Sequence, residues 1–103
     1  MIRARMKLTD TQCELLVEGH ADFDQHGRDI VCAAVSVLVA ALADHVEDEA
    51  GCGAQVWAEI RSGYARVRAG GNRREAYRLV YRGLSRLSDT YPTHVAVAAL
   101  EDA

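Results

Sequence analysis

Two side chains in the first third of the chain could carry out nucleophilic chemistry together, namely His20 and Cys32, twelve positions apart. A cysteine thiolate is a strong nucleophile, and a neighbouring histidine can hold it as an ion pair and then protonate a leaving amine. The segment between them, residues 22–29, is nearly all polar and long enough to fold His20 back towards Cys32. The pair predicts a hydrolase in which Cys32 is the nucleophile and His20 the general base and acid.

The residues around Cys32 favour a reactive thiol. Asp29 directly precedes an apolar run and aspartate is a preferred N-cap residue, so Cys32 is expected in the first turn of a helix. Backbone N–H groups without helical partners and the positive end of the helix dipole stabilise a thiolate there, and they can also receive an oxyanion. Gly19 and Gly27 give the backbone freedom before His20 and within the loop.

Other interpretations of these residues stay open on spacing alone. A cysteine in an apolar helix is most often a small hydrophobic residue, and a histidine after a strand is most often on the surface. With Cys13 and His26, the pair also supplies the two sulfurs and two nitrogens that zinc binds. However, a regular strand would point Cys13 and His20 to opposite faces, and no Cys-x-x-Cys pair is present. We therefore expect no metal and no cofactor.

An arginine row offers a different function, the binding of RNA or of the ribosome. Arg74, Arg78 and Arg82 recur at i, i+4 spacing, with Tyr77 and Tyr81 among them. Such a row is most often a solvated helix face, and the whole chain is acidic, with a net charge of −3. We keep nucleic-acid binding as the alternative to the hydrolase.

Hydrophobic periodicity predicts the elements that position these residues. Alternation with a period of two predicts strands over residues 1–8, 12–20, 54–60 and 64–69, and a short apolar segment predicts a last strand over 94–100. The apolar run after Asp29 is too long for a strand, so it predicts a helix over residues 30–46. That helix is expected to end at the acidic cluster Glu47-Asp48-Glu49 and the breaker Gly51-Cys52-Gly53.

A second helix is predicted to start at a capping box of Asn72 and Glu75 and to end near Asp89. Its expected core face consists of apolar residues at helical spacing: Ala76, Leu79, Val80, Leu84 and Leu87. The order β-β-α-β-β-α-β predicts an α+β fold. We expect one small domain over residues 1–103, with a mixed or antiparallel sheet and both helices on one of its faces.

Composition narrows the class of protein. Half of the residues are hydrophobic and 26% are charged, a balance typical of a folded globular chain. The apolar run over residues 30–43 is shorter than a membrane span, and the first residues do not resemble a signal peptide. Three cysteines, an odd number, argue against a disulfide framework. We expect a cytoplasmic protein without membrane association.

The stretch Gly19-His20-Ala21, followed by Gly27-x-Asp29-Ile30-Val31-Cys32-Ala33-Ala34-x-Ser36, resembles the signature of the ribosomal-processing cysteine proteases, the Prp (YsxB-like) family. The resemblance implies a homodimeric thiol endopeptidase of the bacterial cytoplasm. Its expected substrate is the precursor of ribosomal protein L-twenty-seven, whose N-terminal extension it removes during ribosome biogenesis. The catalytic residues carried over are Cys32 as nucleophile and His20 as general base and acid.

The resemblance also matches Asp29 and Ser36, with less definite roles. We interpret Asp29 as the helix cap that positions Cys32, and Ser36, one turn further on, as a packing or indirectly supporting residue. The loop residues Asp22, Phe23, Asp24 and Gly27 are expected to face the substrate. Acidic side chains there would attract a basic ribosomal peptide, and the polar loop could order over it as a lid. A catalytically silent scaffold is disfavoured because both His20 and Cys32 are present.

Overall fold

The structure, a computed structural model, describes residues 1–50 and 55–103. The predicted breaker Gly51-Cys52-Gly53 lies outside the described residues. The strands are β1 (Ile2–Leu8), β2 (Gln12–Glu18), β3 (Val56–Arg61), β4 (Tyr64–Gly70), β5 (Val95–Val97) and β6 (Glu101–Asp102), and the helices are α1 (Ile30–Ala50) and α2 (Arg74–Thr90). The predicted order is confirmed up to β5.

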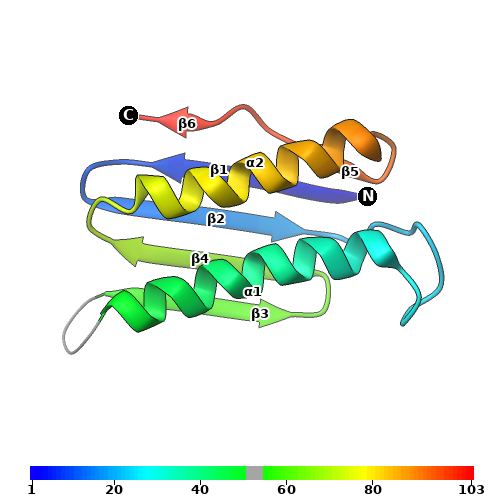
Figure 1. The fold of residues 1–103 in the computed structure, drawn as a ribbon, viewed down its shortest axis with the longest axis horizontal. Coiled ribbons are helices and arrows are strands. Elements are labelled where there is room, and N and C mark those ends of the chain that lie inside the picture. Colours follow the sequence, from blue (N-terminus) through cyan, green and yellow to red (C-terminus); the bar gives the residue numbers. More distant parts are fainter. Residues whose placement is uncertain (51–54) are drawn as a thin grey trace.

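The sheet is mixed, which is one of the two kinds predicted. Its strand order is β3-β4-β2-β1-β5, with the short β6 also pairing with β1. β1, β2, β4 and β3 pair antiparallel through two hairpins, whereas β5 and β6 run parallel to β1. Parallel pairing of β5 with β1 is possible because α2 carries the chain back across the sheet. The result is one small α+β domain (Figure 1).

Both helices cover the same face of the sheet, as predicted (Figure 1). Side chains in β1 alternate strictly between buried and exposed, so one face of the strand builds the core and the other meets solvent. The core between the layers includes Leu8 and Leu15 from the sheet and Leu42 and Leu84 from the helices, each at most 2% exposed. This packing fixes the start of α1, which carries Cys32, near the end of β2 and the start of β4.

α1 is four residues longer than predicted, and the acidic cluster that was expected to end it is helical. Glutamate is a good helix former, and His45 Nε2 lies 3.3 Å from Glu49 Oε1 at i, i+4 spacing. Arg73, before α2, also reaches Glu49 at 2.8 Å. The Arg73–Glu49 ion pair neutralises part of the acidic charge, and both contacts hold Glu49 in the last turn.

The length of α1 affects how its hydropathy is interpreted. The segment Ile30–Glu49 has a mean hydropathy of 1.9 and is long and apolar enough to cross a membrane, which the shorter predicted run was not. Yet Val31, Val35 and Val39 on one side of the helix are buried against the sheet. The core helix of a soluble protein passes the same test of length and composition.

The predicted start and core face of α2 are partly wrong. No side chain caps the helix at Arg73, and Asn72 Oδ1 only accepts a hydrogen bond from Arg74 N at 3.3 Å, so the capping box does not form. Leu79 is 71% exposed, and Tyr77 is buried in its place. Tyr77 can be buried because its hydroxyl donates to the Val67 carbonyl oxygen at 2.9 Å. Burial raises the pKa of this phenol, which therefore stays neutral.

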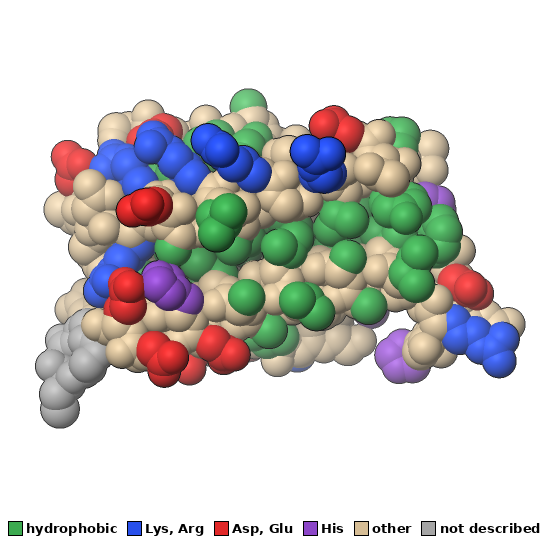
Figure 2. Space-filling model, in the orientation of Figure 1, with side chains coloured by type: hydrophobic (Ala, Val, Ile, Leu, Met, Phe, Trp, Pro, Cys, Tyr) green, Lys and Arg blue, Asp and Glu red, His purple; other side chains and the backbone are tan. Residues whose placement is uncertain are grey.

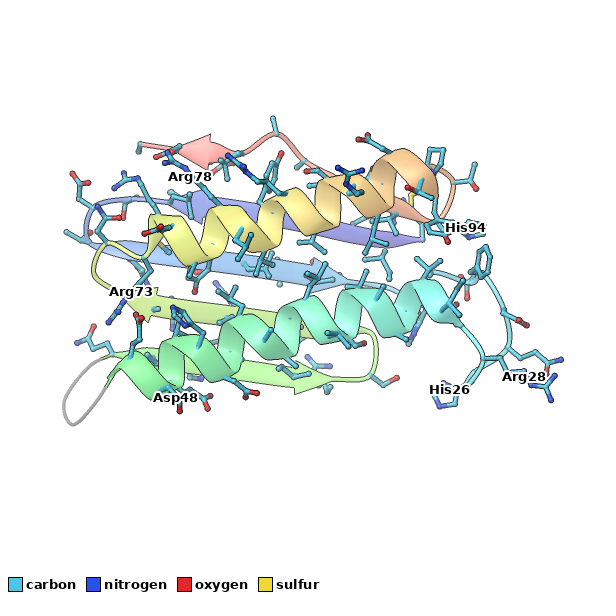
Figure 3. The ribbon with its side chains drawn as sticks, viewed as in Figure 1. His26, Arg28, Asp48, Arg73, Arg78 and His94 are labelled. Atoms are coloured by element: carbon cyan, nitrogen blue, oxygen red, sulfur yellow. The ribbon has the colours of Figure 1, made fainter. Side chains whose placement is uncertain are left out.

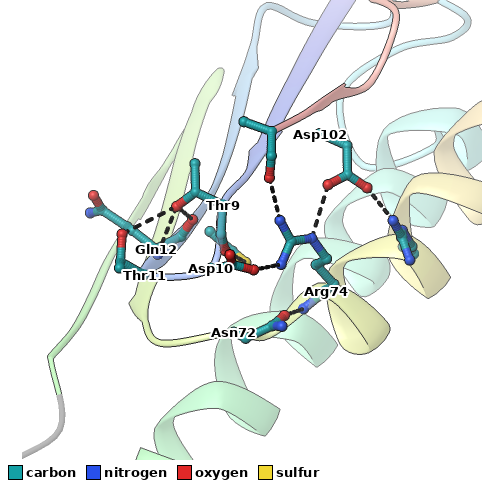
Figure 4. A network of polar contacts seen from close by, with 10 residues as sticks. Thr9, Asp10, Thr11, Gln12, Asn72, Arg74 and Asp102 are labelled. Atoms are coloured by element: carbon teal, nitrogen blue, oxygen red, sulfur yellow. Dashed lines mark hydrogen bonds and ion pairs between the residues drawn. The ribbon is translucent and has the colours of Figure 1, made fainter.

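The C-terminal segment also differs from the prediction of one strand over residues 94–100. β5 stops at Val97, and the chain pairs with β1 again only at β6. Polar contacts fasten this end: Arg74 reaches Asp102 at 2.9 Å and Asp10, in the β1–β2 turn, at 2.6 Å, and Arg78 also pairs with Asp102 (Figure 4). Arg74 thus ties the start of α2 to the β1–β2 turn and to β6, which lie at the same end of the sheet.

Candidate active site

His20 and Cys32 line the same cleft, of about 360 Å³, although they come from different elements. Cys32 lies in the first turn of α1, and His20 follows the end of β2. The remaining walls come from the β3–β4 hairpin and from the middle of α1, including Val35, Ser36 and Ile60. The fold therefore brings together the two residues that sequence analysis paired.

Asp29 caps α1 and so positions Cys32. Its Oδ1 accepts hydrogen bonds from the backbone N–H of Val31 at 3.0 Å and of Cys32 at 2.9 Å. The Ala33 N–H donates to the Asp29 carbonyl oxygen at 3.0 Å, which makes Asp29 the N-cap residue and Cys32 the third residue of the helix. The Cys32 side chain is partly buried and directed into the cleft.

The second oxygen of the Asp29 carboxylate holds the loop that precedes the helix. Oδ2 accepts from the backbone N–H of Phe23 at 3.0 Å and of Asp24 at 3.4 Å. Partial burial raises the pKa of Asp29, but the hydrogen bonds from Cys32, Phe23 and Asp24 outweigh it and leave the pKa below the ordinary value of 3.8. One ionised carboxylate thus joins the helix start to the loop.

The sulfur of Cys32 has a backbone donor directed at it. The Ala21 N–H donates to Cys32 Sγ at 3.3 Å. Ala21 is the residue after His20 and is 1% exposed, so the peptide chain beside the thiol is firmly packed. A backbone N–H aimed at sulfur stabilises negative charge on it.

His20 is held in the cleft by the β3–β4 turn. The Gly19 N–H donates to the Gly63 carbonyl oxygen at 2.9 Å, and the imidazole lies over Gly63. A Cβ atom at Gly63 would approach His20 Nε2 to 2.7 Å, so only glycine leaves room for the ring as it lies. The sequence predicted a turn at this position but gave no signal of the contact with His20.

The loop over residues 22–28 extends beyond the start of α1, with His26 and Arg28 towards its outer end (Figure 3). Asp22 is the one non-glycine residue with positive φ (54°) in the described part of the chain, and Gly27 has φ 88°. The Asp22 carboxylate lies 3.6 Å from the N-terminal amino group. The loop is thus anchored near its start, while its tip is exposed.

His94, in the connection between α2 and β5, contacts this loop. Its Nδ1 lies 2.8 Å from the Ala21 carbonyl oxygen. Phe23 packs edge-on against both His94 and Tyr91, with ring centroids 5.3 Å apart in each pair. Phe23, expected to face the substrate, therefore has one side turned inward and remains 40% exposed. No sequence pattern links positions so far apart.

Three of the residues considered for zinc, His20, His26 and Cys32, line the cleft, but Cys13 does not. Cys13 is fully buried in the core beneath the helices, whereas Cys32 lines the cleft. Within residues 1–50 and 55–103, no three His, Cys, Asp or Glu side chains are grouped as metal ligands.

The arginine row of α2 is only partly available to a nucleic acid. Arg74 is 16% exposed and paired with Asp10 and Asp102, and Arg78 also pairs with Asp102. The positive charge of Arg74 is therefore neutralised by carboxylates of the same molecule, whereas an RNA-binding surface needs arginines that are available to phosphate groups. This observation favours the hydrolase over the RNA-binding alternative.

Comparison with known proteins indicates the family and the fold. The family model described as cysteine protease Prp matches residues 1–96. The fold is similar to the essential ribosomal processing protease Prp of Staphylococcus aureus with a covalently linked product peptide (TM-score 0.75, 17% identity, 100% of both chains covered). The same protease with a substrate peptide gives a TM-score of 0.72 at 16% identity, over 98% of this chain and 100% of that one.

A Streptococcus mutans protein, SMU.848, is also similar, with a TM-score of 0.68, 24% identity and coverage of 100% of this chain and 96% of that one. At such identities the solved structures establish a shared fold. No curated protein sequence matches the chain.

Proposed function

Because this chain belongs to the cysteine protease Prp family, we propose that it is an endopeptidase that removes the N-terminal extension of ribosomal protein L-twenty-seven with a Cys32/His20 dyad. The observation that carries the proposal is that Cys32, at a capped helix start, and His20 line one cleft. A larger groove of about 1170 Å³ between the helices contains neither residue. We place the chemistry in the smaller cleft for that reason.

In the proposed reaction, the Cys32 thiolate attacks the scissile carbonyl carbon and forms a carbon–sulfur bond. The histidinium of His20 protonates the amine as the carbon–nitrogen bond breaks, leaving a thioester on Cys32. His20 then accepts a proton from water as the water oxygen attacks the thioester; the carbon–sulfur bond breaks, which releases the carboxylic acid and restores the Cys32 thiolate beside the histidinium. The charge on sulfur is favoured by the Ala21 N–H and by the helix dipole of α1.

The cleft suits an extended peptide with an apolar side chain. Val35, Val39 and Ile60 line it, and Ile60 is 55% exposed. Beside it, the exposed carboxylates of Asp22 and Asp24 give the loop the negative charge that would attract a basic ribosomal protein. Ser36, one turn after Cys32 on α1, is exposed and lines the same cleft. Among the described residues, its side chain makes no hydrogen bond with His20 or Cys32, so we assign it a packing role.

The proposed enzyme acts as a homodimer in the cytoplasm. Small and apolar side chains remain exposed along α1, among them Ile30 (59%) and Val37 (68%), and Leu79 on α2 faces the same side. Figure 2 shows hydrophobic side chains running along both helices on this face. Contiguous apolar surface of this kind is typical of a subunit interface. Cys13 and Cys32 are both free thiols, as the reducing cytoplasm would keep them.

Incubation with an L-twenty-seven precursor tests the proposal. Wild-type protein should release the extension, and Cys32→Ala should reduce the rate by about 10³-fold or more, as loss of a nucleophile does in other proteases. Cys13→Ala is the matched control, because it removes a free thiol that is buried in the core. It should cleave at close to the wild-type rate. Unchanged processing by Cys32→Ala would sink the proposal.

A further inference from the structure

We propose that His94 is a positioning residue for Cys32. Its imidazole holds the carbonyl group of Ala21, so that the N–H of the same residue stays directed at the sulfur. The inference deepens the proposed function, on which it rests for its role in catalysis. It assigns a part in the site to the connection between α2 and β5, at the far end of the chain.

The contacts form a continuous path from the imidazole to the thiol. His94 Nδ1 lies 2.8 Å from the Ala21 carbonyl oxygen, and the Ala21 N–H donates to Cys32 Sγ at 3.3 Å. A carbonyl oxygen can only accept, so Nδ1 carries the hydrogen in this bond. His94 therefore fixes the orientation of Ala21, the residue that donates to sulfur.

The hydrogen bond from His94 is made at a turn of the backbone. The peptide whose carbonyl His94 binds leads directly into Asp22, whose φ of 54° lies in the left-handed region. Aspartate enters this region more readily than most non-glycine residues, for which it costs about 1–2 kcal/mol, so the hydrogen bond adds to a turn that Asp22 itself favours. Without the bond from His94, the Ala21–Asp22 peptide could rotate, and rotation about the Ala21 Cα would let the adjoining His20–Ala21 peptide turn its N–H away from Cys32.

His94 is itself held on the sheet. The Ile2 N–H donates to the His94 carbonyl oxygen at 2.9 Å, and the His94 N–H donates to the Tyr91 carbonyl oxygen at 2.9 Å. The imidazole also packs edge-on against Phe23. His94 thus makes two separable contacts with the loop: a hydrogen bond to Ala21 and a ring contact with Phe23.

Two substitutions separate these contacts. His94→Asn places an amide N–H near the position of Nδ1 but removes the ring, whereas His94→Phe keeps a ring against Phe23 but cannot donate. The first readout is the rate at which iodoacetamide alkylates Cys32 in the folded protein, with the modified residue identified by peptide mapping. It requires no substrate. The second is kcat and KM for the precursor peptide.

We expect His94→Phe to lower the alkylation rate of Cys32 and kcat by about 3- to 10-fold, the effect of one net hydrogen bond, with KM nearly unchanged. His94→Asn should restore both to near the wild-type values. Equal rates in all three proteins, or a fall in His94→Asn as large as in His94→Phe, would overturn the role of the hydrogen bond. If no protein cleaves the precursor but alkylation still follows the predicted order, the positioning stands and the proposed function fails.

Discussion

At the scale of single residues, the site depends on a contact that only a glycine permits. His20 lies over Gly63, which has φ 72°, and a Cβ atom there would approach the His20 ring to 2.7 Å. The ring is the end of a side chain and can move aside at little cost in stability. We therefore predict that Gly63→Ala reduces peptide cleavage by about 10- to 100-fold, because small displacements of catalytic groups have effects of that size.

Gly71→Ala is the matched control for this prediction. Gly71 also has positive φ (86°), but a Cβ atom there meets nothing within 4 Å. Both variants should lose about 1–2 kcal/mol of unfolding free energy from the left-handed backbone, measured by urea denaturation. Only Gly63→Ala should lose activity beyond what its stability explains. Equal activities in the two variants would show that the position of His20 does not depend on Gly63.

At the scale of elements, the start of α1 and the preceding loop share one carboxylate. Asp29→Ala removes the cap and the loop contacts, and should lower the unfolding free energy by about 0.5–2 kcal/mol. Asp29→Asn keeps an oxygen for Val31 and Cys32 but places an amide group opposite the N–H of Phe23 and Asp24. It should keep most of the stability and speed hydrogen exchange of the Phe23 and Asp24 amides, measured by NMR.

The pH dependence of this contribution follows from the lowered pKa of Asp29. A carboxyl whose pKa is lower in the folded than in the unfolded state stabilises the fold above the unfolded value, near 3.8, and loses that effect as the pH falls through the folded value. The stability difference between wild type and Asp29→Ala should therefore be constant near neutral pH and shrink below about pH 3.8. A difference that grew on acidification would contradict the assigned charge state.

The elements could largely be predicted from the sequence because their signals are local. Alternation in β1 and β2 and the position of Asp29 before the apolar run each act within a few residues. The core face of α2 was predicted wrongly because tertiary packing, and not local spacing, decides which of its side chains are buried. Leu79 has the right spacing for the core, but the buried face follows Tyr77, whose hydroxyl finds a carbonyl oxygen on β4. The contacts of His94 with Ala21 and of Gly63 with His20 are long-range and leave no local pattern.

At the scale of the whole molecule, the apolar face of the helices predicts how two copies associate. Val37 is 68% exposed on α1, so Val37→Glu should cost little in folding but place a charge in the proposed dimer interface. We expect wild-type protein to sediment as a dimer and Val37→Glu to shift towards monomer. Trp57→Ser, on β3 and also exposed (41%), lies on the face of the sheet away from the helices and should stay dimeric. Identical sedimentation of all three proteins would place any interface elsewhere.

The central claim, that Cys32 is the nucleophile of a peptidase, is tested most directly by trapping the thioester. Wild-type protein is mixed with a stoichiometric amount of an L-twenty-seven precursor peptide, quenched with acid within one turnover and mapped by mass spectrometry. We predict a transient adduct on Cys32 with the mass of the N-terminal fragment less one water, and no adduct or cleavage in Cys32→Ala. Cleavage that proceeds in Cys32→Ala, or an adduct on another residue, would contradict the claim.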